Sequence, residues 1–365
     1  MNFFETRISE QAIQNVVSVL RSGKISCGEL NDQFEEKLKN LLGIKNLFTV
    51  NSGTSALHMA LILAGIKPGD EVIIPSQTFI ATGLAVLYCG AKVVFADINW
   101  KTGNIDLEKI TRVVTSKTRA VIVVDWCGHP GNLKPIMDFA NALGITVIED
   151  AAHSLGATYK WESIGNIAHY TCFSFQATKA LTTGDGGAVA TLNEEDTERG
   201  KKLRWFGIDR KNDLPNWTGE RLYNLQEAGY KYHLSDFNAA FGLGLIDEFW
   251  ISFKKRQEIA RFYTEQLEGV RGVVLLDHQP DRTHANWLFT MLVDDRFAFM
   301  NKMRTNGIPV SVVHNGIHRN EVFGNTGVYL YNQRMWDNNH VCLPCHPYLV
   351  IDNLTKIVQT IRGGW

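Results

Sequence analysis

The sequence has no excess of charge of either sign. Its 365 residues include 37 Lys and Arg against 38 Asp and Glu, which gives a formal net charge of -1. A chain with this balance has no broad positive field to attract nucleic acid or an anionic membrane surface. We therefore expect small-molecule partners, no nucleic acid and no membrane.

Long apolar runs are also missing. The most apolar stretches, such as residues 83–96 and 120–127, are shorter than the roughly 20 residues that a membrane-spanning helix needs. The first residues carry Glu5 and Glu10 where a secretion signal has basic residues followed by an unbroken apolar stretch. These absences predict a cytoplasmic protein.

Cysteines are few and scattered. The chain has six, and in a cytoplasmic protein they are expected to be reduced thiols rather than disulfides. The segment CLPCH, residues 342–346, matches both a redox CxxC and a haem-attachment pattern. Its place near the C-terminus, followed by Pro347, favours instead a strand end that leads into a turn.

What the sequence does contain is an alternation of strand-like and helical segments. Short β-branched runs alternate with helical patterns throughout residues 46–192, which is typical of βαβ units and a largely parallel sheet. Unbroken apolar runs such as VIVV fit central strands that are covered on both faces. The expected strands are 46–50, 71–75, 92–97, 120–125, 145–150, 170–175 and 186–191, with helices at about 54–65, 79–88 and 133–143. The fold class is α/β.

The second half of the chain predicts a smaller domain. Residues 235–267 have one long helical pattern, and about 100 residues of alternating strand and helix follow it. We expect a large domain in residues 1–250 and a small α+β domain in residues 251–365.

The segment NSGTS, residues 51–55, lies where an expected strand ends and a helix begins. The free N–H groups of a helix start, together with the hydroxyls of Thr54 and Ser55, can bind a phosphate. An ordinary helix cap has the same pattern, so this segment alone leaves both interpretations open.

A second candidate is IEDAAHS, residues 148–154. Asp150 ends an expected strand and His153 follows three positions later, at the sheet edge where ligands bind in open α/β folds. The carboxylate can pair with a ring nitrogen or cap the following turn. No further cluster of His, Asp or Cys at ligand spacing supports a metal, so none is expected.

Lys179 completes the pattern. It stands between the expected strand FSF and the glycine-rich TTGDGG, which places an amine among backbone segments that can approach closely. The run matches neither a Walker loop nor GxGxxG. The three candidates together are what pyridoxal 5'-phosphate (PLP) requires. The aldehyde of PLP forms a Schiff base with a desolvated lysine, its pyridine nitrogen pairs with a carboxylate, and its phosphate needs an anion-binding helix start.

At these residues the chain resembles the DegT/DnrJ/EryC1/StrS family of sugar aminotransferases, which has the fold-type-I PLP architecture. The resemblance covers nearly the whole chain. It rests on five motifs in the family's order: NSGTSALHMAL, GDEVIIPSQTFIAT, IEDAAHSLGA, FSFQATKALTTGDGG and GYKYHLSDFNAA.

The resemblance implies roles for the residues nearest the cofactor ring. Lys179 would carry the cofactor and then move the proton as a free amine, and Asp150 would keep the pyridine nitrogen protonated. His153 falls near the ring hydroxyl, and Phe79 falls where the family places a flat side chain over the ring. A core phenylalanine is the alternative for Phe79.

The remaining implied contacts lie further out. Ser174, Thr54 and Ser55 would bind the phosphate, together with Lys231 from the neighbouring subunit of a homodimer with shared active sites. Substrate contacts would come from Gln77 and from the loop HNGIHRN, with His314, His318 and Arg319. That loop could equally be exposed without a binding role.

The expected function is a PLP-dependent aminotransferase of deoxyamino sugar and polysaccharide biosynthesis. It would transfer an amino group, from L-glutamate by family analogy, to the C-3 or C-4 keto group of a nucleotide-linked deoxy-sugar. The alternatives are a PLP-dependent sugar dehydratase and a non-catalytic PLP-binding regulatory protein. Relatives that dehydrate sugars have histidine in place of the lysine, so Lys179 favours transamination.

Overall fold

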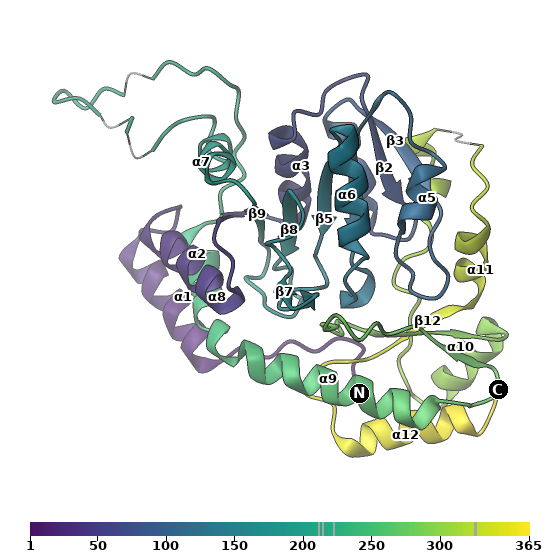
Figure 1. The fold of residues 1–365 in the computed structure, drawn as a ribbon. Helices are drawn as coiled ribbons and strands as arrows, with labels where there is room; N and C mark the ends of the chain where they lie inside the picture. Colours follow the sequence, from purple (N-terminus) through teal and green to yellow (C-terminus); the bar gives the residue numbers. More distant parts are fainter. Residues whose placement is uncertain (211, 214, 222, 325–326) are drawn as a thin grey trace.

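The computed structural model describes residues 1–210, 212–213, 215–221, 223–324 and 327–365. A seven-stranded sheet forms its centre, in the order β1-β9-β8-β5-β4-β2-β3 (Figure 1). The strands are β1 (Leu47–Val50), β2 (Glu71–Pro75), β3 (Lys92–Ala96), β4 (Thr118–Val124), β5 (Thr146–Asp150), β8 (Tyr170–Ser174) and β9 (Gly187–Thr191).

The sheet is mixed but mostly parallel, as the sequence predicts. The pairs β2–β3, β2–β4, β4–β5 and β5–β8 are parallel, whereas β9 runs antiparallel to both β8 and β1. In register, Val124 of β4 pairs with Asp150 of β5, which in turn pairs with Cys172 of β8. The carboxyl ends of three central strands therefore meet at one edge of the sheet.

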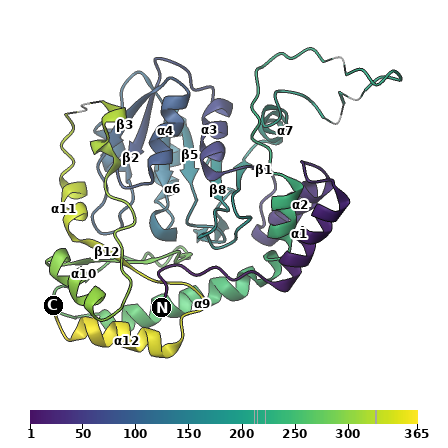
Figure 2. The ribbon, with the colours of Figure 1, turned by 180° about the vertical axis from the view of Figure 1, so that it is seen from behind.

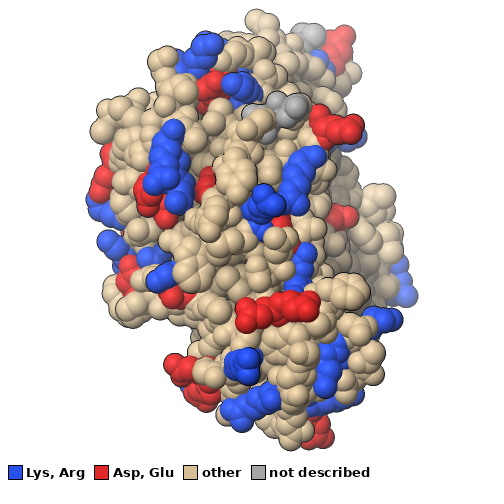
Figure 3. Space-filling view, turned by 90° about the vertical axis from the view of Figure 1, so that its right-hand side faces the viewer, with Lys and Arg blue, Asp and Glu red and all other residues tan. Residues whose placement is uncertain are grey.

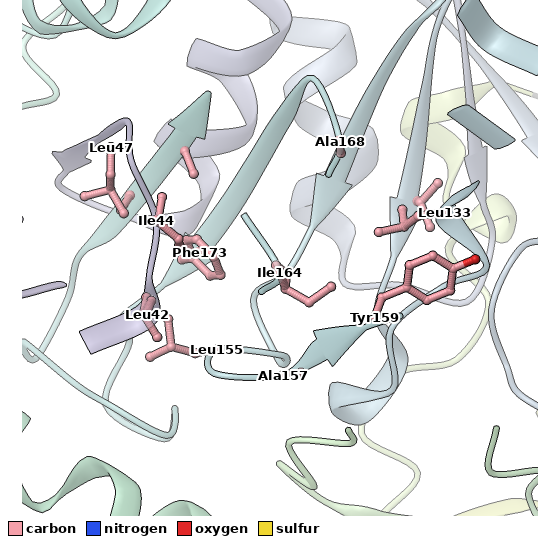
Figure 4. Packing of buried hydrophobic residues seen from close by; sticks show 14 of the residues in the cluster. Leu42, Ile44, Leu47, Leu133, Leu155, Ala157, Tyr159, Ile164, Ala168 and Phe173 are labelled. Atoms are coloured by element: carbon pink, nitrogen blue, oxygen red, sulfur yellow. The ribbon is translucent and has the colours of Figure 1, made fainter. Parts of the chain in front are cut away.

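Helices cover both faces of this sheet (Figures 1 and 2). Along β2, Val72 and Ile74 belong to one buried cluster and Ile73 belongs to the other, which explains the unbroken apolar sequence of the central strands. Figure 4 shows part of the second cluster, where Phe173 of β8 lies with Ile44 and Ile164. The flanking helices are α3 (Gly53–Leu63), α4 (Ile80–Tyr88), α5 (Leu107–Thr111), α6 (Leu133–Leu143) and α7 (Glu194–Leu203).

The prediction of one continuous helix over residues 235–267 is wrong. The structure breaks it into α8 (Asp236–Leu243) and α9 (Phe249–Leu267), with a short 3-10 turn η2 (Ile246–Glu248) between them. The N-terminal helix α1 (Glu10–Ser22) packs on α8. Just before α1, Ser9 Oγ donates a hydrogen bond to the carbonyl oxygen of Gly244, at the end of α8. Because this carbonyl is satisfied by Ser9, the helix can end there.

A second, smaller sheet lies beyond α9. It is antiparallel, in the order β10-β11-β12, and packs with α9 and α12 around its own buried cluster. The proposed division into residues 1–250 and 251–365 stays a prediction. The remaining elements are α2 (Glu29–Leu42), η1 (Trp126–Gly128), β6 (Thr158–Tyr159), β7 (Glu162–Ser163), β10 (Val273–Leu275), β11 (Phe289–Val293), α10 (Arg296–Thr305), η3 (Ile317–Arg319), η4 (Glu321–Phe323), α11 (Tyr331–Asn339), β12 (His340–Leu343) and α12 (Ile351–Arg362).

Three expectations from the sequence, on charge, membrane spans and cysteines, can be compared with the structure. Cationic and anionic side chains are interspersed on the face shown in Figure 3, in keeping with the balanced charge. In the part of the chain that the structure describes, no helix is long and apolar enough to span a bilayer. Cys342 ends up in β12 and Cys345 follows it; both are buried free thiols, which confirms the strand-end interpretation of CLPCH.

Candidate active site

A cavity of about 560 Å³ opens at the carboxyl ends of the central strands. Val124, Asp150 and Ser174, the last residues of β4, β5 and β8, line it together with Cys172 of β8. In an open α/β sheet this edge is where ligands bind, because the strand ends and the helix starts that follow them converge there. The sheet register thus brings together residues that lie far apart in the sequence.

Lys179 reaches into this cavity from the turn after β8. Its Nζ lies 3.9 Å from the centre of the Trp287 ring, a cation–π contact that holds the amine against an apolar wall. Burial of the amine lowers the pKa of Lys179 to about 8, opposed by the negative charge of Asp150 and by Cys127. A lysine with this pKa has an appreciable free-amine fraction near neutral pH, as a nucleophile requires.

Asp150 is buried at the end of β5 and is held from two sides. Thr82 Oγ1 donates to its Oδ2 at 2.8 Å, and the Ala152 N–H donates to its Oδ1 at 3.3 Å. Burial raises the pKa of this carboxyl, and the hydrogen bonds and the charge of Lys179 oppose the rise. Because little water stabilises the Asp150 carboxylate, a cationic group beside it would stabilise its charge, and Asp150 would bind that group strongly.

Two further carboxyls lie behind Asp150. Asp125 and Glu149 are both buried, and Ser154 Oγ donates a hydrogen bond to Asp125. Burial raises the pKa of Asp125 to about 7 and that of Glu149 well above its usual value. The charge of Asp150 adds to both shifts, and Asp125 adds to that of Glu149, whereas the hydrogen bond with Glu149 opposes the shift of Asp125. We expect Glu149 to be neutral. Of the two acids among the described residues that line the cavity, Asp150 is buried and Asp185 is exposed.

Aromatic rings form the walls of the cavity. His153 stacks on Trp287 with ring centroids 4.0 Å apart and an interplanar angle of 14°, and Phe79 lies 5.0 Å from His314. Burial lowers the pKa of His153 well below its usual range and that of His314 to about 4, with the charge of Lys179 adding to both shifts. Both imidazoles are therefore neutral near pH 7. Phe79 is half exposed rather than packed in the core, so the core alternative is wrong.

One end of the cavity is suited to an anion. Gly53 and Thr54 open α3 beside Ser174, and a Cβ at position 53 would lie 2.9 Å from the Cβ of Ser174. Only glycine allows this approach, which brings the start of the helix and the two hydroxyls to the same place. Ser55 is different: its hydroxyl donates to Asn51 Oδ1 at 2.6 Å, and the residue does not line the cavity.

Four other predicted residues lie outside the cavity lining. Gln77 is fully buried and donates to the His314 carbonyl oxygen at 3.0 Å, so it braces the loop that carries His314. His318 Nδ1 lies 2.6 Å from Ser76 Oγ, and Arg319 forms an ion pair with Asp337 at 2.6 Å. Lys231 is exposed, and its Nζ lies 5.6 Å from the Trp205 ring centre.

Sequence reasoning missed several lining residues. Trp287 is the most important, because it contacts Lys179, His153 and Phe4, and its Nε1 donates to the Thr178 oxygen at 2.8 Å. Thr82, which orients Asp150, was missed as well. Nothing local indicates either residue, since Trp287 precedes a strand of the small sheet and Thr82 lies inside a helix.

The chain matches a known family model along almost its whole length. The model is that of the DegT/DnrJ/EryC1/StrS aminotransferase family, and the match covers residues 6–362. The spore coat polysaccharide biosynthesis protein SpsC of Bacillus subtilis is 33% identical over 367 residues, which cover 97% of this chain and 94% of the relative. GDP-perosamine synthase of Caulobacter vibrioides is 33% identical over 267 residues, or 73% of this chain and 70% of the relative.

Solved structures agree with these relatives. The sugar aminotransferase CalS13 from Micromonospora echinospora superimposes with a TM-score of 0.95 at 30% identity, and the match covers 100% of both chains. The fold is thus PLP fold type I, with the mostly parallel sheet described above. On this similarity and on the whole-length match, the chain belongs to the DegT/DnrJ/EryC1/StrS aminotransferase family, a family of PLP-dependent sugar aminotransferases.

Proposed function

We propose that the enzyme transfers the amino group of L-glutamate to the C-3 or C-4 keto group of a nucleotide-linked deoxy-sugar. The observation that carries the proposal is the amine of Lys179, which lies against Trp287 and shares one cavity with Asp150 and the start of α3. Lysine in this place supports amino transfer rather than the dehydration or simple binding that were the alternatives.

The residues present fit PLP. Thr54 and Ser174, at the close approach that Gly53 allows, would hold its phosphate, and Asp150 would hold its ring nitrogen. When bound, PLP supplies an aldehyde that accepts the amino group and a ring that withdraws electrons from the substrate carbon. His153 and Phe79, as flat neutral walls, would restrict the ring to one plane.

Lys179 has the proton-transfer role. As a free amine, its Nζ can take the proton from the substrate carbon and deliver it to the carbon that carried the cofactor's aldehyde, because a pKa of about 8 lies close to the working pH. The Trp287 wall keeps water from the same amine, so the proton is less readily lost to solvent.

The donor can be identified directly. Holoenzyme mixed with L-glutamate should lose the visible absorbance of bound PLP and release 2-oxoglutarate, whereas L-alanine and L-aspartate should remove this absorbance much more slowly. NMR of the aminated sugar would then assign C-3 or C-4. Unchanged absorbance with every amino acid tried would overturn the proposal in favour of a binding protein.

We also propose a homodimer in which each site uses both chains. Among the described lining residues, Lys179 is the one ordinarily cationic side chain, yet a phosphate and a dicarboxylate donor bring several negative charges. Lys231 is exposed and lies outside the lining of its own chain's cavity. Lys231 of a second copy is the cation that we assign to the phosphate. The cytoplasmic location stays a prediction.

Mixing two damaged chains tests this arrangement. Lys231→Ala should lower activity by about 10- to 100-fold, because it removes a charge-assisted hydrogen bond, and Lys179→Ala should be inactive. Dimers re-formed from equal amounts of both variants should regain about a quarter of wild-type activity, since half are mixed and each mixed dimer has one intact site. If the mixture is no more active than its parts, the shared site is wrong.

The lowered pKa of Lys179 predicts a pH dependence. Only the free amine can react with the PLP aldehyde, so the rate at which apoprotein takes up PLP covalently should rise with pH, with a midpoint at about 8. Stopped-flow absorbance measures this rate. A midpoint near the ordinary lysine pKa of about 10.4 would contradict the burial of the amine.

A further inference from the structure

Three histidines meet beside the loop that follows β4, in a cavity separate from the strand-end cavity. His129 follows η1 after β4, and His278 and His284 lie in the connection between β10 and β11. Each offers one ring nitrogen, and the three nitrogens all lie within 4.8 Å of one another. The ring centroids of His129 and His284 are 5.2 Å apart.

His129 lacks the hydrogen bonds that a buried imidazole requires. The residue is 4% exposed, and neither Nδ1 nor Nε2 has a hydrogen-bond partner among the described residues. A neutral imidazole has one N–H donor and one lone pair, and burying both without partners is unfavourable. A ligand that accepts the lone pair would remove part of this cost.

The space beside the three rings is open. They line a cavity of about 390 Å³ together with Gln257, Arg261 and Thr264 of α9. Among the described residues, this cavity shares no lining residue with the strand-end cavity. A metal ion on the three nitrogens would thus have one coordination position left for water or another small ligand.

The charges around the cluster do not prevent a cation from binding. The guanidinium of Arg282 lies close enough to His129 to lower the pKa of that imidazole, but it is paired with Asp281 at 2.8 Å. Arg261 lies 3.9 Å from Glu265, and the charge of Asp277 acts on His278. Each cationic neighbour therefore has an acidic counterpart.

We propose that His129, His278 and His284 form a three-histidine site for a divalent transition-metal ion, with Zn²⁺ as the expected occupant. Imidazole nitrogen suits Zn²⁺, Cu²⁺, Ni²⁺ and Co²⁺ rather than Mg²⁺ or Ca²⁺. Nitrogens about 3.4 Å apart would satisfy tetrahedral Zn²⁺ at its usual bond length. The exposed His278 can supply the remaining movement by rotating its side chain.

The protonation states agree with this geometry. Burial lowers the pKa of His129 to about 3 and lowers the pKa values of His278 and His284 below their ordinary range. The neutral form of imidazole is the one that binds a metal. Because His284 Nδ1 accepts the Asn286 N–H at 2.9 Å, Zn²⁺ binding at this ring must displace its Nε2 proton or break that hydrogen bond.

A metal here would fasten two parts of the chain that shape the active site. The loop after β4 already pairs with the segment before β11, through the Ala285 N–H to the Gly128 oxygen at 2.8 Å and the Trp287 N–H to the Cys127 oxygen at 3.0 Å. The same segment carries Trp287, on which Lys179 lies. We expect the ion to hold this segment in place rather than to take part in amino transfer.

Calorimetric titration of untagged, PLP-loaded enzyme with Zn²⁺, after removal of metals with a chelator, tests the proposal. We expect one Zn²⁺ per chain and a higher melting temperature of the loaded form. Co²⁺ should give the intense visible bands of a four-coordinate ion. His278→Ala, which alters an exposed side chain, and His284→Ala should each weaken Zn²⁺ binding by at least about 100-fold, since even loss of an outer partner costs about 10- to 100-fold.

Gln279→Ala is the matched control, because Gln279 lines the same cavity and lies next to His278. It should bind Zn²⁺ as wild type does. Three results would each overturn the proposal: no stoichiometric Zn²⁺ binding, a weak six-coordinate Co²⁺ spectrum, or equal Zn²⁺ affinity in wild type and the two histidine variants. Equal affinity is the result expected if Zn²⁺ binds instead to the imidazoles of the active site.

Discussion

Replacing Lys179 with alanine is expected to lower amino transfer by about 10⁴-fold. This is the upper end of the range for loss of an acid–base group, and we expect it because the same amine also attaches the cofactor. Its burial against Trp287 leaves no other amine among the described lining residues to replace it. Single-turnover kinetics with the donor amino acid measure the loss, and a small primary amine added to the buffer should restore part of the rate.

Lys160→Ala is the matched control for this variant. Lys160 also lies over an aromatic ring, with its Nζ 5.7 Å from the centre of Tyr159, but it is exposed and outside the cavity. Its loss should leave the rate unchanged. A Lys179→Ala enzyme that keeps more than a hundredth of the wild-type rate would show that another base moves the proton.

Replacing Asp150 with asparagine should lower the rate by about 10²- to 10³-fold, the usual loss when one preorganised electrostatic partner of a transition state is removed. Asparagine has nearly the same shape and can still accept the hydrogen bond from Thr82, so the fold should persist. What changes is the charge: an uncharged amide cannot stabilise a protonated ring nitrogen. Steady-state kinetics separates this effect from loss of the cofactor when bound PLP is measured in parallel by its visible circular dichroism.

Asp138→Asn, on the exposed face of α6, serves as the charge control. If Asp150→Asn retains activity within threefold of wild type, the carboxylate is not the partner of the ring nitrogen. Because Asp125 and Glu149 are buried behind Asp150, the double variant Asp150→Asn/Asp125→Asn would then show whether the pair behind it supplies the charge.

Local patterns predicted much of the fold. The bounds of β2 and of α6 agree with the expected 71–75 and 133–143, because β2 is a short, unbroken β-branched run and α6 has apolar residues at helical spacing. The break between α8 and α9 was not predictable, because it depends on Ser9 and α1, which lie more than 200 residues away in the sequence.

In the site, too, residues marked by local sequence patterns were predictable and residues placed by distant parts of the chain were not. Thr54, Asp150, Ser174 and Lys179 were predictable because each lies at or soon after a strand end or in the first turn of a helix, and parallel strands bring those ends together. Trp287 and the histidine cluster were not, since His129 and His278 belong to different parts of the chain and meet only through the packing of α9 and the small sheet. The sequence expectation of no metal site rested on ligand spacing along the chain, which cannot detect such a cluster.

Borohydride reduction of the PLP-loaded enzyme, followed by proteolysis and mass spectrometry, tests the central claim most directly. We predict one pyridoxyl group per chain, found on the peptide that contains Lys179 and absent from the Lys179→Ala variant. A label on any other lysine, or no label at all, would contradict the assignment of Lys179 as the residue that anchors the cofactor and moves the proton.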